Sequence, residues 1–390
     1  MTSKRTALIV SPVSNLAGVA RHIIDLSRVG VPEWELVVTA PEGPLLDELR
    51  RQGTHVVPLA LDTMNVFAAA RALRTLIRRL RPKVVHSHLA RADILTALAT
   101  PGLPVVLVTT EHHIPPDRFM FHSSRPAAIA METVHHLRLR RVAEAMAVSS
   151  STARDMRKWW RTSVPITVVL NGVDRADEQE RRVPGLRFLS LTRLSPEKNV
   201  QATLRGFAQV LEQRPEARLT IAGDGPEGPA LRAEAERLDL RDAICFAGFV
   251  DPVKAMSEHD VIVQPSLSDN FSYTLLDAVV AGMGVVASPI GGNPEMLPPQ
   301  CIVPIGDDAE LARTMLEQGL DTDERPELPP EVPTVAGMAA QVAGVYARAV
   351  HHSIHGVRFG KGASVKSRAR RATVEADDPC RSPVEERKSA

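Results

Sequence analysis

Short apolar segments rich in valine and isoleucine alternate with helical patterns along most of the chain, and this alternation limits the fold more than any other feature. The first segment, residues 6–10, is followed by a loop at 11–18 and then by Val19, Ile23, Ile24 and Leu26 along one side of a helix. Alternation of this kind is typical of a parallel sheet with helices on both faces. We therefore expect an α/β protein.

The pattern occurs in two consecutive series. The first predicts strands at 6–10, 36–39, 56–59, 84–86, 105–109, 145–148 and 168–170, with further helices at 45–52, 66–80 and 93–99. The second predicts strands at 187–191, 218–222, 244–246, 260–263, 285–287 and 301–303, with helices at 200–213, 227–238, 253–258, 273–281, 294–297 and 309–317. Two doubly wound Rossmann-like domains follow from this, at 1–170 and 186–333, joined by a charged linker at 171–185.

The end of the chain has a different character. Residues 334–350 predict one more amphipathic helix, and the polar, arginine-rich tail at 351–390 has no apolar period and is expected to be disordered. The three cysteines are scattered without a CxxC pair, which argues against a disulfide framework or a zinc ribbon and favours a cytoplasmic location. We expect neither a signal peptide nor a membrane span, because the apolar runs are too short.

Charge is distributed unevenly. Residues 1–180 contain 23 Lys and Arg against 17 Asp and Glu, whereas the net charge of the whole chain is only +1. Solvated helix faces are the commoner explanation, and contact of a basic first domain with the inner face of a membrane or with an acidic acceptor is the other. Trp159 and Trp160, among arginines and Lys158, form a basic aromatic patch that fits either a membrane contact or a half-buried helix end. No nucleic-acid partner is expected.

The stretch at 264–295 is the strongest candidate for a binding site. An apolar strand ends near Pro265, a loop follows, and a helical pattern begins at Tyr273. Ligands of open α/β sheets bind at the carboxyl ends of strands, and the free N–H groups of a new helix favour an anion. Because Asp269 and Asp277 are the two acidic residues of the loop and the helix, the stretch predicts an anion site with a carboxylate on either side.

Six motifs in the same order resemble family 4 retaining glycosyltransferases of the GT-B fold. Residues 191–199, LTRLSPEKN, resemble the GRLxxEKN motif of that family, and 221–227, IAGDGPE, resemble (I/V)xGxGPE. The others are AVS at 147–149, NGVD at 171–174, FAGFV at 246–250, and residues 265–282, which resemble PSxxExFxxxxLEAxAxG. The resemblance covers residues 6–350. It implies two Rossmann-like domains facing across a cleft, with the C-terminal helix crossing back to the first.

The resemblance also implies an activity and a set of roles. The expected reaction moves a sugar, with retention, from a nucleoside diphosphate sugar to an acceptor hydroxyl, with no cofactor and no bound metal ion. Arg193 and Lys198 would meet the charge of the departing diphosphate. Asp269 and His112, the latter in the sequence TEH, would orient the sugar, and Asp277 would bind the ribose. Backbone N–H groups near the phosphates would come from Asn270, Phe271, Ser272 and Tyr273, and Gly18 would permit close approach of the first-domain loop to the diphosphate.

Two departures from the family pattern stand out. Both acidic positions are aspartate where the family has glutamate, and a carboxylate displaced by about an ångström can cost roughly 100-fold in rate. The first-domain loop keeps one glycine, Gly18, where the family has two adjacent glycines. For His112, a satisfied core histidine is the alternative, and the repeated histidines at 86, 88, 112, 113, 135 and 136 lack a third ligand at metal spacing.

Two other functions remain open at this point. One is a nucleotide-sugar epimerase on the same scaffold, which needs acid and base residues facing the sugar and no acceptor. The other is a non-catalytic nucleotide-sugar-binding protein, which the two aspartates make conceivable. The acceptor carries no readable motif, so a small natural product, a glycan and a lipid are all compatible with the sequence.

Overall fold

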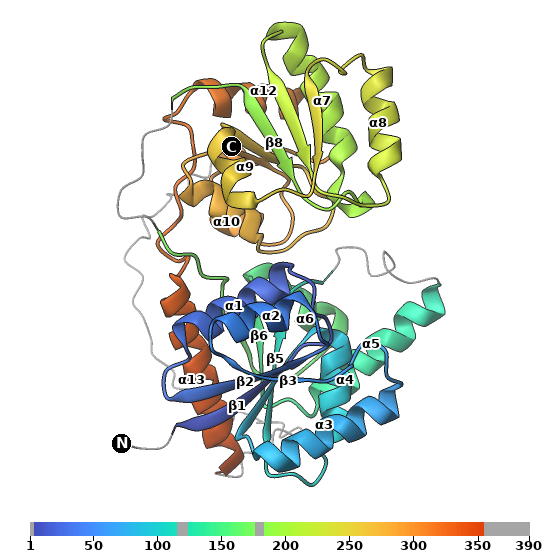
Figure 1. Ribbon diagram of the computed structural model, residues 1–390, viewed down its shortest axis with the longest axis vertical. Helices are drawn as coiled ribbons and strands as arrows, with labels where there is room; N and C mark the ends of the chain where they lie inside the picture. Colours follow the sequence, from blue (N-terminus) through green and yellow to red (C-terminus); the bar gives the residue numbers. More distant parts are fainter. Residues whose placement is uncertain (1–3, 115–123, 176–182, 355–390) are drawn as a thin grey trace, which may run out of the picture. The chain divides into compact units, whose positions relative to one another are not determined.

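The computed structural model describes residues 4–114, 124–175 and 183–354, and these form two parallel sheets (Figure 1). The first sheet has seven strands in the order β3-β2-β1-β4-β5-β6-β7. Their bounds are Arg5–Val10, Trp34–Ala40, His55–Pro58, Val84–His88, Val106–Glu111, Glu144–Ala147 and Ile166–Val168 for β1 to β7. The strands are short and mostly buried, as expected for a sheet covered on both faces.

Helices cover both faces of the first sheet. Apolar side chains of α1 (Gly18–Val29), α2 (Pro44–Arg51) and α13 (Val335–Ile354) pack in one core cluster with strand residues. α3 (Val66–Leu80) and α4 (Leu89–Ala99) pack in another, and α6 (Ser150–Trp160) packs near β6 together with the end of α5 (Arg125–Leu139). The predicted C-terminal helix therefore crosses back to the first sheet, where the Tyr346 ring is fully buried.

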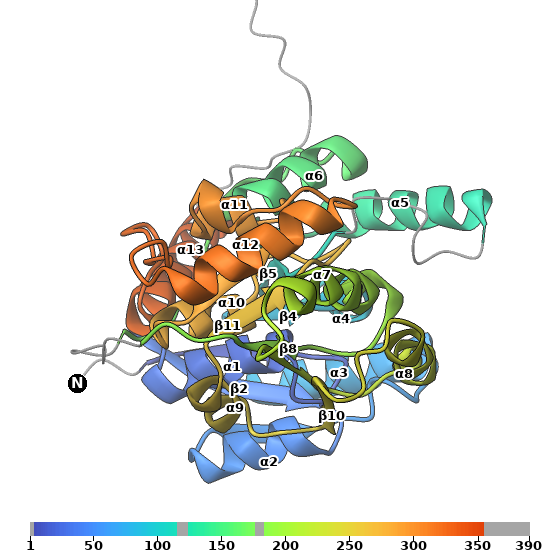
Figure 2. The same ribbon diagram turned by 90° about the horizontal axis from the view of Figure 1, so that it is seen from above.

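The second sheet has five parallel strands in the order β10-β9-β8-β11-β12. Their bounds, from β8 to β12, are Arg187–Leu191, Arg218–Ala222, Ile244–Gly248, Val261–Gln264 and Gly284–Ala287. One face is covered by α7 (Val200–Gln213), α8 (Gly228–Arg237) and α12 (Asp308–Leu320), and Figure 2 shows α7 and α12 side by side. The other face is covered by α9 (Pro252–Glu258), α10 (Tyr273–Val280) and α11 (Asn293–Met296).

Some predicted elements are wrong. The strand expected at 301–303 is absent from the described second sheet: the chain makes a 3-10 turn, Pro299–Cys301, and a single bridge from Ile302 to Ala287. Helices α5 and α6 were not predicted, and β7 lies two residues earlier than expected. Residues 351–354, predicted as disordered, continue α13. The rest of the predicted tail, 355–390, and residues 176–182 of the predicted linker lie outside the described residues.

A buried ion-pair network joins α4, α5 and the end of β5. The Arg138 guanidinium, 4% exposed, donates to Asp93 and to Glu111, and Asp93 also accepts from Ser87 and from the Thr109 hydroxyl. Burial raises the pKa of Glu111 to about 7, although Arg138 opposes the shift. The network fixes the backbone of Glu111, the residue directly before His112.

Replacing Arg138 by methionine should be strongly destabilising. Removing one partner of a buried ion pair leaves uncompensated charge and typically costs about 3–5 kcal/mol. The matched control is Arg313→Met on α12, whose guanidinium is half exposed and pairs with Glu310 and Glu317, and which should cost under about 1 kcal/mol. Urea unfolding of both variants at pH 7 measures the difference. Equal losses would show that the buried network contributes no more than a surface pair.

Candidate functional site

The strand orders place two switch points where loops leave neighbouring strands in opposite directions. In the first sheet these are the ends of β1 and β4, and in the second the ends of β8 and β11. Ligands of open α/β sheets bind at such points. The loops there carry Gly18 after β1, Arg193 and Lys198 after β8, and Asp269 after β11. Four predicted site residues therefore lie at positions that the topology alone favours.

Lys198 and Asp269 form an ion pair at the second switch point. Lys198 ends a 3-10 turn, Pro196–Lys198, and its Nζ lies 2.6 Å from Asp269 Oδ2. The Gln264 amide also donates to this oxygen at 2.6 Å, and the other carboxylate oxygen accepts from the Asn270 backbone N–H. Both side chains of the pair are less than one-fifth exposed. The shorter aspartate is thus held in place by three donors.

Arg193 does not join this pair. Its side chain is 73% exposed and its guanidinium bonds Glu197 at 3.0 Å. The glycines of the IAGDGPE motif explain the position of its loop: a Cβ on Gly223 would lie 1.9 Å from the Thr192 carbonyl oxygen, and one on Gly225 would lie 2.2 Å from the Leu194 carbonyl oxygen. These glycines allow one backbone to pack directly on another and so fix the loop that carries Arg193.

Asn270 connects the loop after β11 to the first sheet. Its Nδ2 donates to the His112 carbonyl at 2.7 Å, and its Oδ1 accepts from the Ser149 hydroxyl at 2.7 Å. The next residue, Phe271, is buried, and its carbonyl accepts from the Asn171 amide. Through Asn270 the predicted sugar-orienting residues His112 and Asp269 are brought to neighbouring positions.

Asp277 lies in a second group of charged and aromatic side chains. The Arg21 guanidinium approaches the Asp277 carboxylate at 3.4 Å, bonds Asp25 at 2.7 Å, and lies over the Tyr273 ring with its carbon 5.4 Å from the centroid. Gly18 is next to this group, since a Cβ there would lie 3.9 Å from the same ring. Burial raises the pKa of Asp277, and Arg21 opposes the shift.

Two helices begin at these loops without a side-chain cap. Neither Ala17, before α1, nor Ser272, before α10, makes a side-chain hydrogen bond to its helix. The first N–H groups of a helix have no partner within the helix and favour an anion. The two helix starts, at Gly18 and Tyr273, therefore supply N–H groups to the same region.

Four histidines lie together beside this region. His22, His86 and His88 are buried and His112 is half-buried, and the His88 and His112 rings are bonded at 2.8 Å between Nδ1 and Nε2. Burial lowers the pKa of His22 to about 4 and of His86 to about 3, and lowers the pKa of His88 and of His112 well below the usual range. All four rings are therefore neutral at pH 7. His113, the next residue, bonds Ser268.

The described part of the chain contains no group of three or more His, Cys, Asp or Glu side chains suited to a metal ion.

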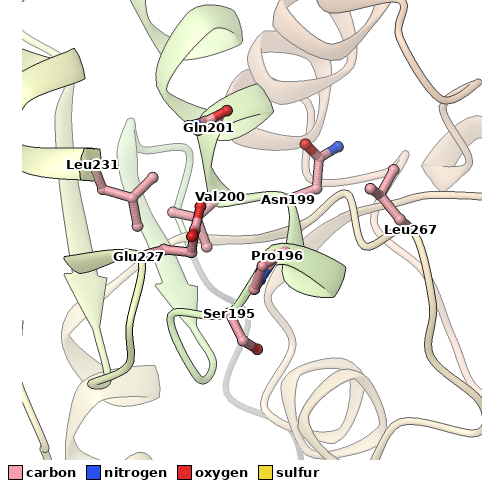
Figure 3. Close-up of a pocket in the computed structure, with 8 residues that line it drawn as sticks. All are labelled: Ser195, Pro196, Asn199, Val200, Gln201, Glu227, Leu231 and Leu267. Carbon is pink, nitrogen blue, oxygen red and sulfur yellow. The ribbon is translucent and has the colours of Figure 1, made fainter. Parts of the chain in front are cut away.

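A small pocket of about 160 Å³ lies beside the Pro196–Lys198 turn, lined by Pro196, Asn199, Glu227 and Leu267 among others (Figure 3). Because ligand pockets usually measure about 300–1,000 Å³, we assign it no ligand. None of the described helices has a stretch of low polarity long enough to cross a bilayer.

The sequence did not reveal several residues that contact the predicted ones. Gln264 bonds Asp269, Arg21 bonds Asp277, and His88 bonds His112. The spacing of His86 and His88 was a usable signal, because alternate residues of a strand point to one face. The basic aromatic patch is partly buried: the Trp160 ring is buried and stacks on His135.

Comparison with known proteins gave consistent results. The model of the family described as Glycosyltransferase Family 4 matches residues 16–177, and that described as Glycosyl transferases group 1 matches residues 185–318. An alpha-monoglucosyldiacylglycerol synthase of Streptococcus pneumoniae is 29% identical over 37% of this chain and 36% of its own length. One component of the human phosphatidylinositol N-acetylglucosaminyltransferase is 23% identical over 74% of this chain and 62% of its own length. The chain thus spans between about a third and three fifths of these relatives.

Solved structures agree on the fold. A glycosyltransferase from Rickettsia africae superimposes with a TM-score of 0.69 at 17% identity, over 89% of this chain and 99% of its own. The Anabaena protein HepE, solved in complex with UDP-glucose, gives 0.68 at 16% identity, over 90% and 98%. Both neighbours have the two-sheet GT-B fold.

The histidine group predicts acid sensitivity. His86 is neutral in the folded protein down to its pKa of about 3, whereas in the unfolded chain it titrates near 6.5, so the unfolded chain takes up the proton first as the pH falls. The free energy of unfolding should therefore decrease below pH 6.5, by about 2 kcal/mol at pH 5 from His86 alone. His86→Gln should remove that decrease, as measured by urea unfolding at pH 7 and pH 5.

Glu111 acts in the opposite direction, because its raised pKa of about 7 makes its contribution more favourable as the pH falls toward 4.5. Glu111 is present in the wild-type protein and in His86→Gln, so the difference between their pH-dependent free energies of unfolding reports His86. An identical decrease in stability with and without His86 would contradict the assignment.

Proposed function

Since the chain belongs to family 4 of the glycosyltransferases, we propose that it transfers a sugar from a nucleoside diphosphate sugar to an acceptor hydroxyl. We further propose that the transfer retains the anomeric configuration and needs no bound divalent metal ion. The observation that supports this most is the contact between Asn270 and the His112 carbonyl, because it joins the sugar-orienting positions of the family into one site.

The charges of the site suit a departing diphosphate. When the bond between the sugar C1 and the phosphate oxygen breaks, negative charge grows on the phosphate, and fixed donors aimed there lower the barrier. Lys198 and the uncapped starts of α1 and α10 are such donors, and Arg193 is an exposed cation on the neighbouring loop. In this proposal these groups do the work that a metal ion does in other transferases.

The carboxylates act on the sugar and the ribose. Asp269, held by Lys198 and Gln264, faces the sugar together with His112. Asp277 binds the ribose hydroxyls, and Arg21 either moves off the Asp277 carboxylate or bonds the hydroxyls as well. A new bond forms between C1 and the acceptor oxygen on the face from which the phosphate leaves. The acceptor proton passes to the leaving phosphate oxygen, so no protein base is required.

Names of related proteins indicate which substrates to test first. HepE was solved with UDP-glucose, the synthase named above makes, by its name, a monoglucosyldiacylglycerol, and the human transferase acts, by its name, on phosphatidylinositol. We therefore propose a UDP-sugar donor and a lipid-linked acceptor.

The surface of α3 supports contact with an anionic membrane. The helix carries four arginines and no acidic residue, and Phe67 on its first turn is 82% exposed. Arg71, Arg78 and Arg79 are exposed, while Arg74 bonds the carbonyls of Ala99 and Pro101. Clustered arginines next to an exposed apolar ring are suited to a bilayer surface of negative charge.

A panel of UDP-, GDP- and dTDP-sugars tests the proposed function. With a lipid acceptor present, diphosphate release together with a glycosylated product supports transfer. A donor whose sugar is altered without an acceptor would favour the epimerase, and tight binding without turnover would favour the non-catalytic protein.

Lys198→Ala should lower kcat by about 100- to 1,000-fold, the loss typical of removing one donor that stabilises transition-state charge. The matched control is Lys254→Ala on α9, whose exposed ammonium lies 3.8 Å from Glu258 and which is not among the predicted site residues. Steady-state kinetics with a saturating donor measure both. Unchanged kcat in Lys198→Ala would show that the site assignment is wrong.

Reversing charge on α3 should release the protein from anionic vesicles. Each basic residue near such a surface contributes about 1 kcal/mol, so Arg78→Glu with Arg79→Glu should weaken binding to phosphatidylglycerol vesicles by at least roughly 30-fold. Sedimentation with vesicles measures this. The control Arg214→Glu with Arg241→Glu makes the same net charge change on exposed residues next to α7 and α8. Equal weakening by both pairs would exclude a contact specific to α3.

A further inference from the structure

The contact between His88 and His112 indicates a function for His88, which has no role in the proposed mechanism. His88 is the last residue of β4 and is fully buried, and His112 follows β5, the neighbouring strand. The two rings are nearly parallel, with an interplanar angle of 30° and centroids 5.1 Å apart, and His88 Nδ1 lies 2.8 Å from His112 Nε2. Each ring therefore constrains the proton of the other.

One hydrogen bond between two imidazole nitrogens contains one proton. Since both rings are neutral, each carries a single N–H, and only two arrangements are possible. Either His88 donates from Nδ1 and His112 has its own proton on Nδ1, or His112 donates from Nε2 and His88 has its own proton on Nε2. In the first arrangement His88 Nε2 has no hydrogen, and in the second it carries one.

The surroundings of His88 Nε2 distinguish the two. This atom is buried and has no hydrogen-bond partner among the described residues. Buried N–H groups without an acceptor are rare, and leaving a buried polar group unsatisfied costs about 1–3 kcal/mol. A proton on His88 Nε2 would be such an orphaned donor, whereas a bare nitrogen in that position is a lone pair without a donor. The first arrangement, with His88 donating, is therefore favoured.

The neighbouring His22 follows the same rule. Its Nδ1 lies 3.2 Å from the Asn171 Oδ1, and the amide nitrogen of Asn171 donates to the Phe271 carbonyl, so Oδ1 is the acceptor and His22 Nδ1 carries the proton. His22 Nε2 is then bare, and it too is buried without a partner among the described residues. His22 and His88 thus each carry their single proton on Nδ1, where it has an acceptor, and each leave Nε2 without a hydrogen in the protein interior.

A second histidine of β4, His86, packs against the His88 ring. The His86 ring packs against it with centroids 4.2 Å apart, and His86 bonds the Tyr346 hydroxyl and the Thr110 hydroxyl at 2.7 Å each. Tyr346 belongs to α13, the helix that crosses back to the first sheet. His86 is therefore bonded to β5 and α13, and it contacts the His88 ring without a hydrogen bond to His88 or to His112.

We propose that His88 is a positioning residue that holds His112 in the tautomer protonated at Nδ1, so that His112 presents an N–H donor to an oxygen of the donor sugar. The second half of this statement rests on the proposed function, and the first does not. Which ring nitrogen is protonated is set by the bond that the other nitrogen makes. A hydroxyl oxygen of the sugar accepts such a donor, whereas a bare imidazole nitrogen would require the hydroxyl to donate instead.

The test measures the tautomer directly. In protein labelled with ¹⁵N-histidine, long-range proton–nitrogen correlation spectra at pH 7 distinguish protonated from bare ring nitrogens, and His112→Gln identifies the signals of residue 112. We expect His112 protonated at Nδ1. In His88→Leu the bond is lost and the His112 signals should shift toward the Nε2-protonated or mixed form. His88→Asn keeps an amide N–H near the position of Nδ1 and should restore the wild-type pattern.

Activity provides the second readout. His88→Leu should lower kcat/KM for the sugar donor by roughly 10- to 100-fold, as when outer partners of ligating histidines are removed, and His88→Asn should recover most of it. His86→Gln is the matched control, a buried neighbour on the same face of β4 without a bond to His112, and should leave the His112 tautomer unchanged. Thermal unfolding of each variant confirms that the comparison concerns folded protein.

The outcomes separate the two proposals. His112 protonated at Nε2 in the wild-type protein, or a tautomer that changes in His86→Gln but not in His88→Leu, would overturn the role of His88 whatever the activity. The expected tautomer in a protein that transfers no sugar from any donor would leave the His88 bond established and contradict the proposed function. The expected tautomer with unchanged kcat/KM in His88→Leu would overturn the second half of the proposal.

Discussion

The side-chain amide of Asn270 is the contact on which the rest of the site depends. It is 5% exposed, and both of its ends are used: the oxygen accepts from Ser149 and the nitrogen donates to the His112 carbonyl. A buried amide with satisfied partners fixes one arrangement, because any other leaves a polar group unpaired. Glu295 adds a second connection, since its carboxylate accepts from the backbone N–H groups of Ser150 and Ser151 at the start of α6. Loops that leave two different sheets are thereby held to one another at the residues expected to orient the sugar.

The fold followed from the sequence wherever a strand or helix was determined by its own residues. Buried strands such as β1 and β11 are continuous apolar runs, and helices such as α7 show apolar residues at helical spacing. The strand expected at 301–303 failed because apolar character alone does not supply a ladder of partners: the segment makes a single bridge, from Ile302 to Ala287 at the end of β12. Helix α6 was missed because arginines and tryptophans obscure its apolar period, although Ser149 is a recognisable N-cap whose hydroxyl accepts from the Thr152 N–H.

The site was predictable to the extent that motifs mark single positions. Lys198 and Asp269 were identified separately, and the structure pairs them, while the exposed Arg193 side chain bonds Glu197 instead. Two of the partners could not be predicted, because they come from other parts of the chain: Arg21 is 256 residues from Asp277 and His88 is 24 residues from His112. The structure also gives a physical context for the two aspartates, since Lys198 and Gln264 both reach the short Asp269 carboxylate.

In the proposed mechanism this site makes a new glycosidic bond on the face from which the diphosphate leaves. The most direct measurement is the NMR spectrum of the product formed from a ¹³C-labelled nucleotide sugar and the acceptor, in which the one-bond coupling at C1 reports the anomeric configuration. Transfer with retention predicts a product with the anomeric configuration of the donor. A product of inverted configuration would contradict the mechanism, and free sugar as the sole product, with acceptor present and bound, would contradict the proposed transfer.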